Sequence, residues 1–295
     1  MTRTKAFLLM LIVTAGWGAS YMWLKIALTG VHPLMVVGLR FMIAFIAMAI
    51  VFPKALMKTT KRDCGISFVL GLLLFLLFTS VVVGLKTTSA STAGFLTSTT
   101  AIFVAIFDAI LHRRWPGRLT VVTTVTVIVG LYLLTASGPM VLNRGALFCL
   151  GTAALYAVYI LLSNHWAKKR HVTLKVSILQ LGVAGGLGMG TGFLFEPVTF
   201  PTTVKQWGAI LALGLICSAF GFMVQPLAQR VLDPETISLI FSLEPLFAAL
   251  FAFLVLGEVL TGREAVGAAI IFMSVVVAQV AKARAVSKMS PGGQK

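Results

Sequence analysis

Residues 65–85 read GISFVLGLLLFLLFTSVVVGL and contain no charged side chain. An α-helix needs about 20 consecutive, predominantly apolar residues to cross the hydrocarbon core of a bilayer. The run has that length, and its apolar side chains would cover every face of a helix, which leaves no face suited to water. It predicts a transmembrane helix rather than the surface helix of a soluble protein.

Nine other segments have the same character, and together they account for most of the chain. The 295 residues are 59% hydrophobic and only 11% charged, with a mean hydropathy of +1.01. Soluble domains have about 25% charged residues, so an ordinary cytoplasmic enzyme is excluded. The ten predicted spans are residues 6–28, 33–52, 65–85, 88–111, 119–136, 145–166, 173–195, 206–228, 235–256 and 264–281.

The basic residues lie mainly in the short loops between these spans. With a cytoplasmic N-terminus, 18 of the 24 Lys and Arg lie on the cytoplasmic side and four on the other, as the positive-inside rule requires. The alternation predicts both termini in the cytoplasm and a multi-pass protein of the bacterial inner (plasma) membrane. We interpret the net charge of +16 as topology signals and contacts to lipid headgroups, not as a nucleic-acid site.

Ten spans divide into two halves of five, and an odd number per half makes the second half insert upside down. Internal matches agree with this division: an offset of 138 aligns Tyr21 with Tyr159, and an offset of 144 aligns Phe103 with Phe247. Secondary transporters often have inverted repeats, with the substrate site at the repeat interface. We expect an all-α integral membrane fold of ten transmembrane helices in two inverted five-helix repeats. The expected units are residues 1–140, 141–285 and a cytoplasmic tail, 286–295.

Lys25, Arg40 and Glu244 lie inside predicted spans, where lipid makes charge costly and function is the default explanation. Lys25 is near the outer end of its span, so it could select charge at a gate or simply snorkel to the interface. Arg40 is about eight residues into the second span, roughly 12 Å deep. Glu244 is near the middle of span nine and precedes Pro245, which frees a backbone carbonyl one turn earlier. Glu244 is a candidate for substrate binding, gating or coupling; a structural hydrogen bond to another helix is the alternative.

Aromatic and hydroxyl side chains form stripes on several spans. Trp17 and Tyr21 lie four residues apart on one face of the first span, and Tyr156 belongs to a comparable stripe on the sixth. Thr97 and Thr100 lie in a hydroxyl-rich stretch of the fourth span. Aromatic bodies combined with hydrogen-bonding tips are typical of small-molecule sites. Packing between helices with satisfied hydroxyls is the alternative.

The chain has no motif for enzymatic chemistry. No HExxH, GxSxG or phosphate-loop pattern occurs, and the cysteines and histidines lack metal-ligand spacing. We expect neither an enzyme nor a cofactor or metal site. Gly182, Gly186 and Gly190 repeat every fourth residue and predict a smooth face for close helix packing.

The chain resembles the EamA family of the drug/metabolite transporter (DMT) superfamily over essentially its whole length. The motifs that carry the resemblance are LEPLFAAL at 243–250, Gly257-Glu258, Gly267-Ala268-Ala269 and Gln225 in the second half, and Trp17-Gly18, Lys25, Pro33 and Arg40 in the first. The fourth span departs from the pattern. It has Thr100-Ala101 where the second half has Glu244-Pro245, and Arg113-Arg114 where Gly-Glu is common, so we expect the two halves not to bend alike.

The resemblance implies a central cavity bounded by spans one, three, four, six, eight and nine, and transport of amino acids, related metabolites or drugs, usually outward. We expect a secondary carrier that exports a small organic metabolite by alternating access. An exchanger of organic anions selected by Arg40 and Lys25, a passive channel and a membrane scaffold are alternatives. The expected partners are a small-molecule substrate and membrane lipid; monomer and homodimer both stay open. The expected substrate contacts are Trp17, Tyr21, Tyr156 and Phe222 as aromatic walls, Thr97, Thr100 and Gln225 as polar contacts, and Glu244 as the charged group.

Overall fold

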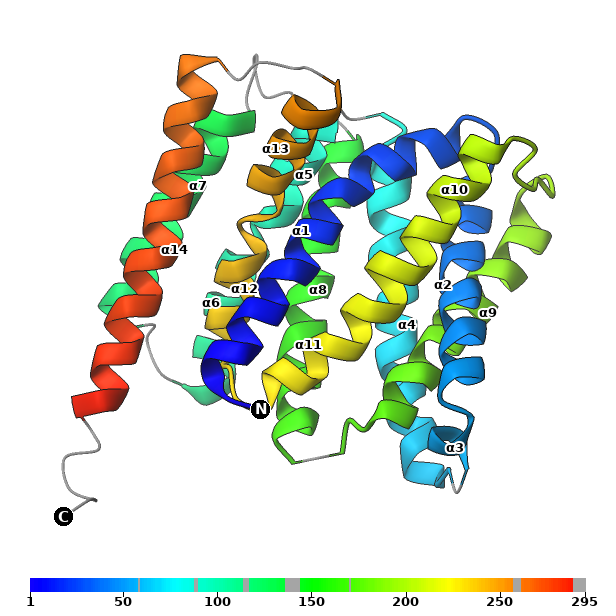
Figure 1. Ribbon diagram of the computed structural model, residues 1–295, viewed down its shortest axis with the longest axis horizontal. Helices are drawn as coiled ribbons and strands as arrows, with labels where there is room; N and C mark the ends of the chain where they lie inside the picture. Colours follow the sequence, from blue (N-terminus) through cyan, green and yellow to red (C-terminus); the bar gives the residue numbers. More distant parts are fainter. Residues whose placement is uncertain are drawn as a thin grey trace.

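The protein is a bundle of helices (Figure 1). The computed structural model describes residues 1–57, 59–87, 90–113, 117–135, 144–169, 171–256 and 261–288, and this part of the chain contains no β-strand. Its helices are α1 (Arg3–Leu28), α2 (Pro33–Val51), α3 (Pro53–Leu56), α4 (Lys61–Gly84), α5 (Ala90–Ser98), α6 (Thr100–His112), α7 (Arg118–Thr135), α8 (Arg144–Lys168), α9 (Leu174–Phe195), α10 (Val204–Ala212), the π-helix η1 (Leu213–Phe220), α11 (Gly221–Gln229), α12 (Pro234–Phe241), α13 (Glu244–Leu256) and α14 (Gly262–Lys288).

Six helical stretches are long and apolar enough to cross a membrane. They are α1, α2, α4, α8, α9 and the continuous stretch Val204–Gln229 that contains η1. Shorter apolar helical stretches lie within the other four predicted spans: Leu96–His112, Arg118–Gly130, Thr236–Ala248 and Ala265–Ser274. The all-helical membrane fold is confirmed, and the count of ten spans stays a prediction.

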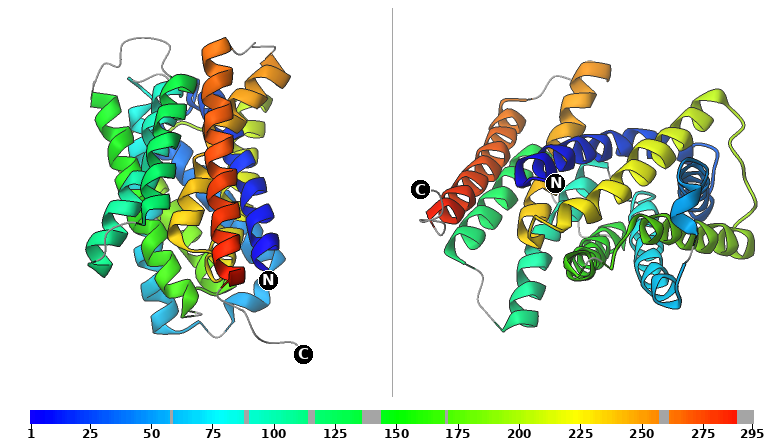
Figure 2. Two further views of the ribbon diagram at one scale, coloured as in Figure 1. Left: turned by 90° about the vertical axis from the view of Figure 1, so that its left-hand side faces the viewer. Right: turned by 60° about the horizontal axis from the view of Figure 1, so that its bottom comes forward.

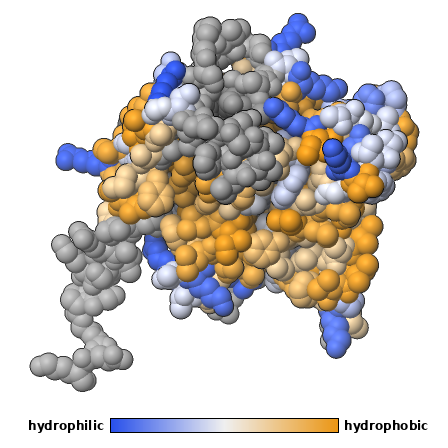
Figure 3. Space-filling view, turned by 45° about the horizontal axis from the view of Figure 1, so that its top comes forward, coloured by the Kyte–Doolittle hydropathy of each residue, from blue (hydrophilic) through white to orange (hydrophobic). Residues whose placement is uncertain are grey.

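Apolar side chains dominate the outside of the bundle as well as its core. Leu8, Ile12, Ile50 and Leu194 are among the exposed large hydrophobic residues. On the face shown in Figure 3, hydrophobic residues form a broad area and hydrophilic residues gather toward its edges. Such an apolar exterior fits lipid, since soluble monomers rarely expose contiguous apolar patches larger than a few hundred Å².

Helices from the two predicted halves interleave. α2 packs on α9 at one side of the bundle and α7 packs on α14 at the other (Figure 1). α1 contacts α13 of the second half, and α8 contacts α6 of the first half in return. The beginning of α1 and the end of α14 lie at the same end of the bundle (Figures 1 and 2). This reciprocal packing is the arrangement expected of two related halves; the boundaries of the repeats and the cytoplasmic location of the termini stay predictions.

Both halves contain a broken helix at equivalent positions, which corrects the expectation that the halves would not bend alike. α5 and α6 are separated at Thr99, and α12 and α13 are separated at Ser242 and Leu243. An offset of 144 places the first residues of α5 and α6 on those of α12 and α13. Thr99 and Thr100 donate their hydroxyls to carbonyl oxygens within their own chain segment, to Leu96 and Thr97. Hydroxyl groups that bond back to the backbone bend helices, so this stretch breaks without a proline.

The glycines that bring α2 and α9 together are not those that the sequence predicts. A Cβ atom at Gly185 or Gly188 would lie within 2.7 Å of the α2 backbone. Nothing lies within 4 Å of the corresponding position at Gly186 or Gly190, and Gly182 meets only the ring of Phe45. The predicted face is wrong because a strict four-residue repeat drifts around a helix of 3.6 residues per turn. Spacings of three and four residues stay on the contact face.

Candidate functional site

A cavity of about 650 Å³, including its open mouth, lies between the two halves. It receives side chains from α1, α2, α4, α5, α6, α8, α12 and α13, and from no residue of η1 or α11. The family resemblance implies that span eight bounds the cavity. In this structure span eight does not line the cavity, and α2 lines it instead. The lining residues are Trp17, Ser20, Tyr21, Leu24, Arg40, Leu77, Phe78, Val81, Thr97, Ser98, Thr100, Thr152, Tyr156, Phe241 and Glu244.

An aromatic cluster of Trp17, Tyr156 and Phe241 forms one wall of the cavity, and Phe222 packs behind it. The Trp17 ring centroid lies 4.9 Å from that of Phe241 and 5.4 Å from that of Phe222. Tyr156 stacks on Phe241 with an interplanar angle of 12°. Aromatic rings at these separations pack favourably and give a rigid apolar surface.

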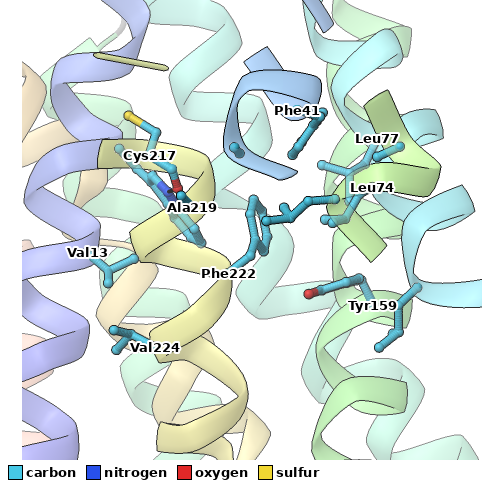
Figure 4. Close-up of a cluster of buried hydrophobic side chains, with 14 of the residues drawn as sticks. Val13, Phe41, Leu74, Leu77, Tyr159, Cys217, Ala219, Phe222 and Val224 are labelled. Carbon is cyan, nitrogen blue, oxygen red and sulfur yellow. Dashed lines mark hydrogen bonds between the residues drawn. The ribbon is translucent and has the colours of Figure 1, made fainter. Parts of the chain in front are cut away.

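Phe222 and Gln225 do not line the cavity. Phe222 is fully buried behind the wall, where it contacts Trp17 and Phe78. Its ring also contacts that of Tyr159 (Figure 4). Gln225 is also fully buried, and neither atom of its amide has a hydrogen-bond partner in the described structure. Buried amides are normally hydrogen-bonded. Phe222 therefore buttresses the wall from behind. The role of Gln225 in substrate contact stays a prediction.

Tyr21, Thr97 and Glu244 form a polar group at the broken helices. The Tyr21 hydroxyl lies 3.2 Å from the Thr97 hydroxyl, and Glu244 lines the same cavity. Thr97 donates its hydroxyl to the Ala93 carbonyl, and Thr100 donates to the Thr97 carbonyl at 2.7 Å. Both residues line the cavity, and their role as polar contacts to a substrate stays a prediction.

Glu244 is the first residue of α13. Its carboxylate is near the helix N-terminus, where the unpaired backbone N–H groups favour negative charge. Gly18 of α1 lets this helix end approach closely, because a Cβ at Gly18 would lie 2.8 Å from the Glu244 carbonyl oxygen and 2.7 Å from the Cβ of Phe247. The close contact places the charged end of α13 beside the Trp17 and Tyr21 face of α1.

Arg40 is the positive group of the cavity. Its side chain is 1% exposed, its Nε donates to the Ser218 Oγ at 3.0 Å, and its guanidinium carbon lies 4.3 Å from the centre of the Phe78 ring. Ser218 in turn donates to the Leu213 carbonyl, five residues earlier, at 2.9 Å. A hydroxyl and an aromatic ring therefore fix the orientation of the cation.

The π-helix η1 hydrogen-bonds two of the residues that line the cavity, and the sequence pattern did not predict this helix. The Cys217 carbonyl accepts the Trp17 Nε1 hydrogen bond at 2.8 Å, while Ser218 orients Arg40. π-Helical turns accommodate extra residues and recur at functional sites. The one sequence signal is length: the stretch Val204–Gln229 has 26 residues, and α4, its counterpart in the first half, has 24.

Lys25 lies in the last turn of α1 and is exposed, outside the cavity lining. The structure therefore places it where snorkelling to the interface explains it, and does not bring it together with Arg40. Among the described residues, no group of three or more His, Cys, Asp and Glu could hold a metal ion.

A cavity between interleaved halves, lined at the breaks of two helices inside an apolar bundle, is typical of a multi-pass membrane transporter. The chain belongs to the EamA-like transporter family, whose model matches residues 4–136 and 143–279, within the drug/metabolite transporter superfamily. The match confirms the resemblance.

Two relatives agree with this membership, and a solved structure shares the fold. Two uncharacterized transporters of Archaeoglobus fulgidus are 30% and 28% identical to the chain; the alignments cover 87% and 93% of it and 91% and 86% of those proteins. A solved crystal structure that is 20% identical superimposes with a TM-score of 0.80 over 96% of this chain and 99% of that one, and it supports the fold alone.

Proposed function

We propose that the protein is a secondary carrier that moves a small organic metabolite, an amino acid or a related compound or drug, outward across the inner (plasma) membrane. The observation that carries the proposal is the cavity that holds Arg40 and Glu244 beside the aromatic cluster. A few charged groups within apolar walls supply selectivity, and the aromatic wall fits an amphipathic body.

The position of the cavity supports alternating access. In the predicted topology its lining residues come from the middle and the outer halves of their helices, such as Tyr21 and Leu24 of α1 and Val81 of α4. The transition of such carriers is a rocking of one half against the other around a site near the middle of the membrane. The present conformation is therefore outward-facing in this proposal.

The C-terminal ends of α8 and α11, which lie away from the cavity, are joined by a polar tie of hydrogen-bonded side chains. Ser163 donates to the Gln229 Oε1 at 2.6 Å, and the Gln229 Nε2 donates to the Ile160 carbonyl at 3.2 Å. Asn164 donates to the carbonyl oxygens of Gln229 and Leu232 at 3.1 and 3.0 Å. This tie lies within the second half and should move with it. The inner seal must join the two halves, and we assign it to the ion pair between Arg3, at the beginning of α1, and Asp233, next to the beginning of α12, at 3.6 Å.

Counterflow in proteoliposomes tests the proposal. Vesicles loaded with unlabelled amino acids, cationic drugs or organic anions should accumulate the matching labelled compound transiently and with saturation. Imposed pH gradients then report whether Glu244 takes a proton or selects a cationic group. Linear, unsaturable flux without counterflow would support a passive channel, and no flux would support a scaffold.

Glu244→Gln should abolish this counterflow while the protein inserts normally. A lost charge-assisted hydrogen bond corresponds to roughly a 10- to 100-fold loss. The matched control is Asp108→Asn, because Asp108 lies outside the cavity lining and pairs with His112 at 3.3 Å. Full activity of Glu244→Gln would remove this residue from the site.

A further inference from the structure

Arg40 carries a buried charge that forms no direct ion pair with a described carboxylate, although Glu244 lines the same cavity. Its Nη1 atom has no hydrogen-bond partner, although almost none of the side chain is exposed. The ion pairs of the described residues join Arg3 to Asp233, Lys175 to Asp63 and His112 to Asp108, and none includes Arg40. A buried cation without a partner is strongly unfavourable, so natural proteins keep one mainly where an anion binds.

The protein nevertheless holds this cation in one orientation. The guanidinium group has five N–H donors in a planar fork. Ser218 accepts from Nε, and the Phe78 and Phe41 rings lie 4.3 and 5.1 Å from the guanidinium carbon. Nε is thus bonded and two aromatic rings pack close to the guanidinium group, while Nη1 has no bond and Arg40 lines the cavity.

A purely structural role does not account for this arrangement. α2 and η1 already pack backbone to backbone, since a Cβ at Gly214 would lie 3.0 Å from the Arg40 carbonyl oxygen. This close approach requires no charge. A residue that only joined two helices would also be expected to have all its buried donors satisfied.

We propose that Arg40 forms an anion subsite of the cavity that takes the carboxylate of a monoanionic organic substrate. The inference rests on the proposed transport function and specifies its substrate class. Arg40 supplies the charge and the free Nη1 donor, Ser218 positions the guanidinium group, and the aromatic cluster receives the apolar part of the same molecule.

The second charge of the cavity favours a carboxylate over a phosphate. Glu244 lines the same cavity. One carboxylate neutralises Arg40, whereas a doubly charged phosphate would bring excess negative charge toward Glu244. Planar carboxylates also match the guanidinium fork, which can donate two parallel N–H bonds to them.

Three probes of similar shape test the subsite: phenylacetate, phenylacetamide and phenethylamine, which are anionic, neutral and cationic. Each is titrated against the purified full-length protein while thermal unfolding is followed, because a ligand that binds the folded state raises its unfolding temperature. Phenylacetate should stabilise the protein in a saturable way, and phenylacetamide should not. In Arg40→Gln, phenylacetate should bind about 10- to 100-fold more weakly.

Two further variants keep the test decisive. Ser218→Ala leaves the charge in place but removes its positioning partner, and should weaken phenylacetate binding by a smaller factor, even if Arg40→Gln fails to fold. Lys25→Gln is the matched control, because it removes an exposed cation outside the cavity, and it should bind phenylacetate as the wild type does.

Phenylacetate binding no better than that of phenylacetamide, or equal in wild type and Arg40→Gln, would overturn the subsite. The two proposals can fail separately. Binding of phenylacetate through Arg40 without any counterflow would keep the subsite and remove the carrier. Saturable counterflow of cations alone, unchanged by Arg40→Gln, would keep the carrier and remove the subsite.

Discussion

The Trp17 indole N–H donates a 2.8 Å hydrogen bond to the Cys217 carbonyl oxygen, 200 residues further along the chain. This bond joins α1, which carries Tyr21, to η1, which carries Ser218 and thereby orients Arg40. The thiol of Cys217 returns a second contact to the Gly16 carbonyl at 3.3 Å. The aromatic wall and the positive charge of the cavity therefore depend on one interface between the two halves.

Trp17→Phe should weaken both stability and transport. The phenyl ring keeps the apolar contacts but cannot donate, so the Cys217 carbonyl loses its partner at a cost of about 1–3 kcal/mol. We expect a lower temperature of thermal unfolding and a lower rate of counterflow. Trp207→Phe, at a residue that is 41% exposed, is the control and should change neither. Equal stability of the two variants would argue against a structural role for the bond.

Gly18→Ala should displace the charged end of α13. The added Cβ would overlap Phe247 and the Glu244 carbonyl oxygen, and a forced shift of packed helices costs typically 1–3 kcal/mol. The rate of counterflow should be more sensitive to this change than the free energy of unfolding, because the shift moves Glu244 relative to Tyr21. Gly190→Ala adds the same methyl group in open space and should transport normally. If both variants behave alike, the close approach of α1 and α13 has no functional weight.

Gly188→Ala should destabilise the contact between α2 and α9. Its Cβ would lie 2.6 Å from the Gly38 amide nitrogen, and backbone cannot move aside as a side chain can. We expect a marked fall in the unfolding temperature. Gly186→Ala, two residues earlier, meets nothing within 4 Å and should leave the unfolding temperature unchanged or slightly higher. If Gly186→Ala lowered the unfolding temperature more than Gly188→Ala, the glycine face predicted from the sequence would be the correct one.

The sequence predicts the properties that depend on composition and local pattern. Apolar length identifies the spans, and the scarcity of charge inside them singles out Arg40 and Glu244, which both line the cavity. Tyr21, Thr97, Thr100 and Tyr156 follow from helical periodicity and are also brought to it.

The remaining features depend on contacts between distant segments. Phe222 lies behind the cavity wall because η1 changes the helical phase of α11, and the spacing within that span assumes a regular α-helix. Ser218 gains its role only through Arg40, 178 residues away. The break at Thr99 was missed because hydroxyl back-bonding replaces the proline that marks the other half.

The most direct test of the central claim is to lock the inner seal. A short thiol cross-linker between Arg3→Cys and Asp233→Cys should hold the beginnings of α1 and α12 together across the two halves, with each single variant as control. We predict that the locked protein still binds a cavity ligand identified by thermal shift but gives no counterflow, and that cleavage of the linker restores it. Counterflow at the unlocked rate in the fully cross-linked protein would contradict alternating access around this cavity.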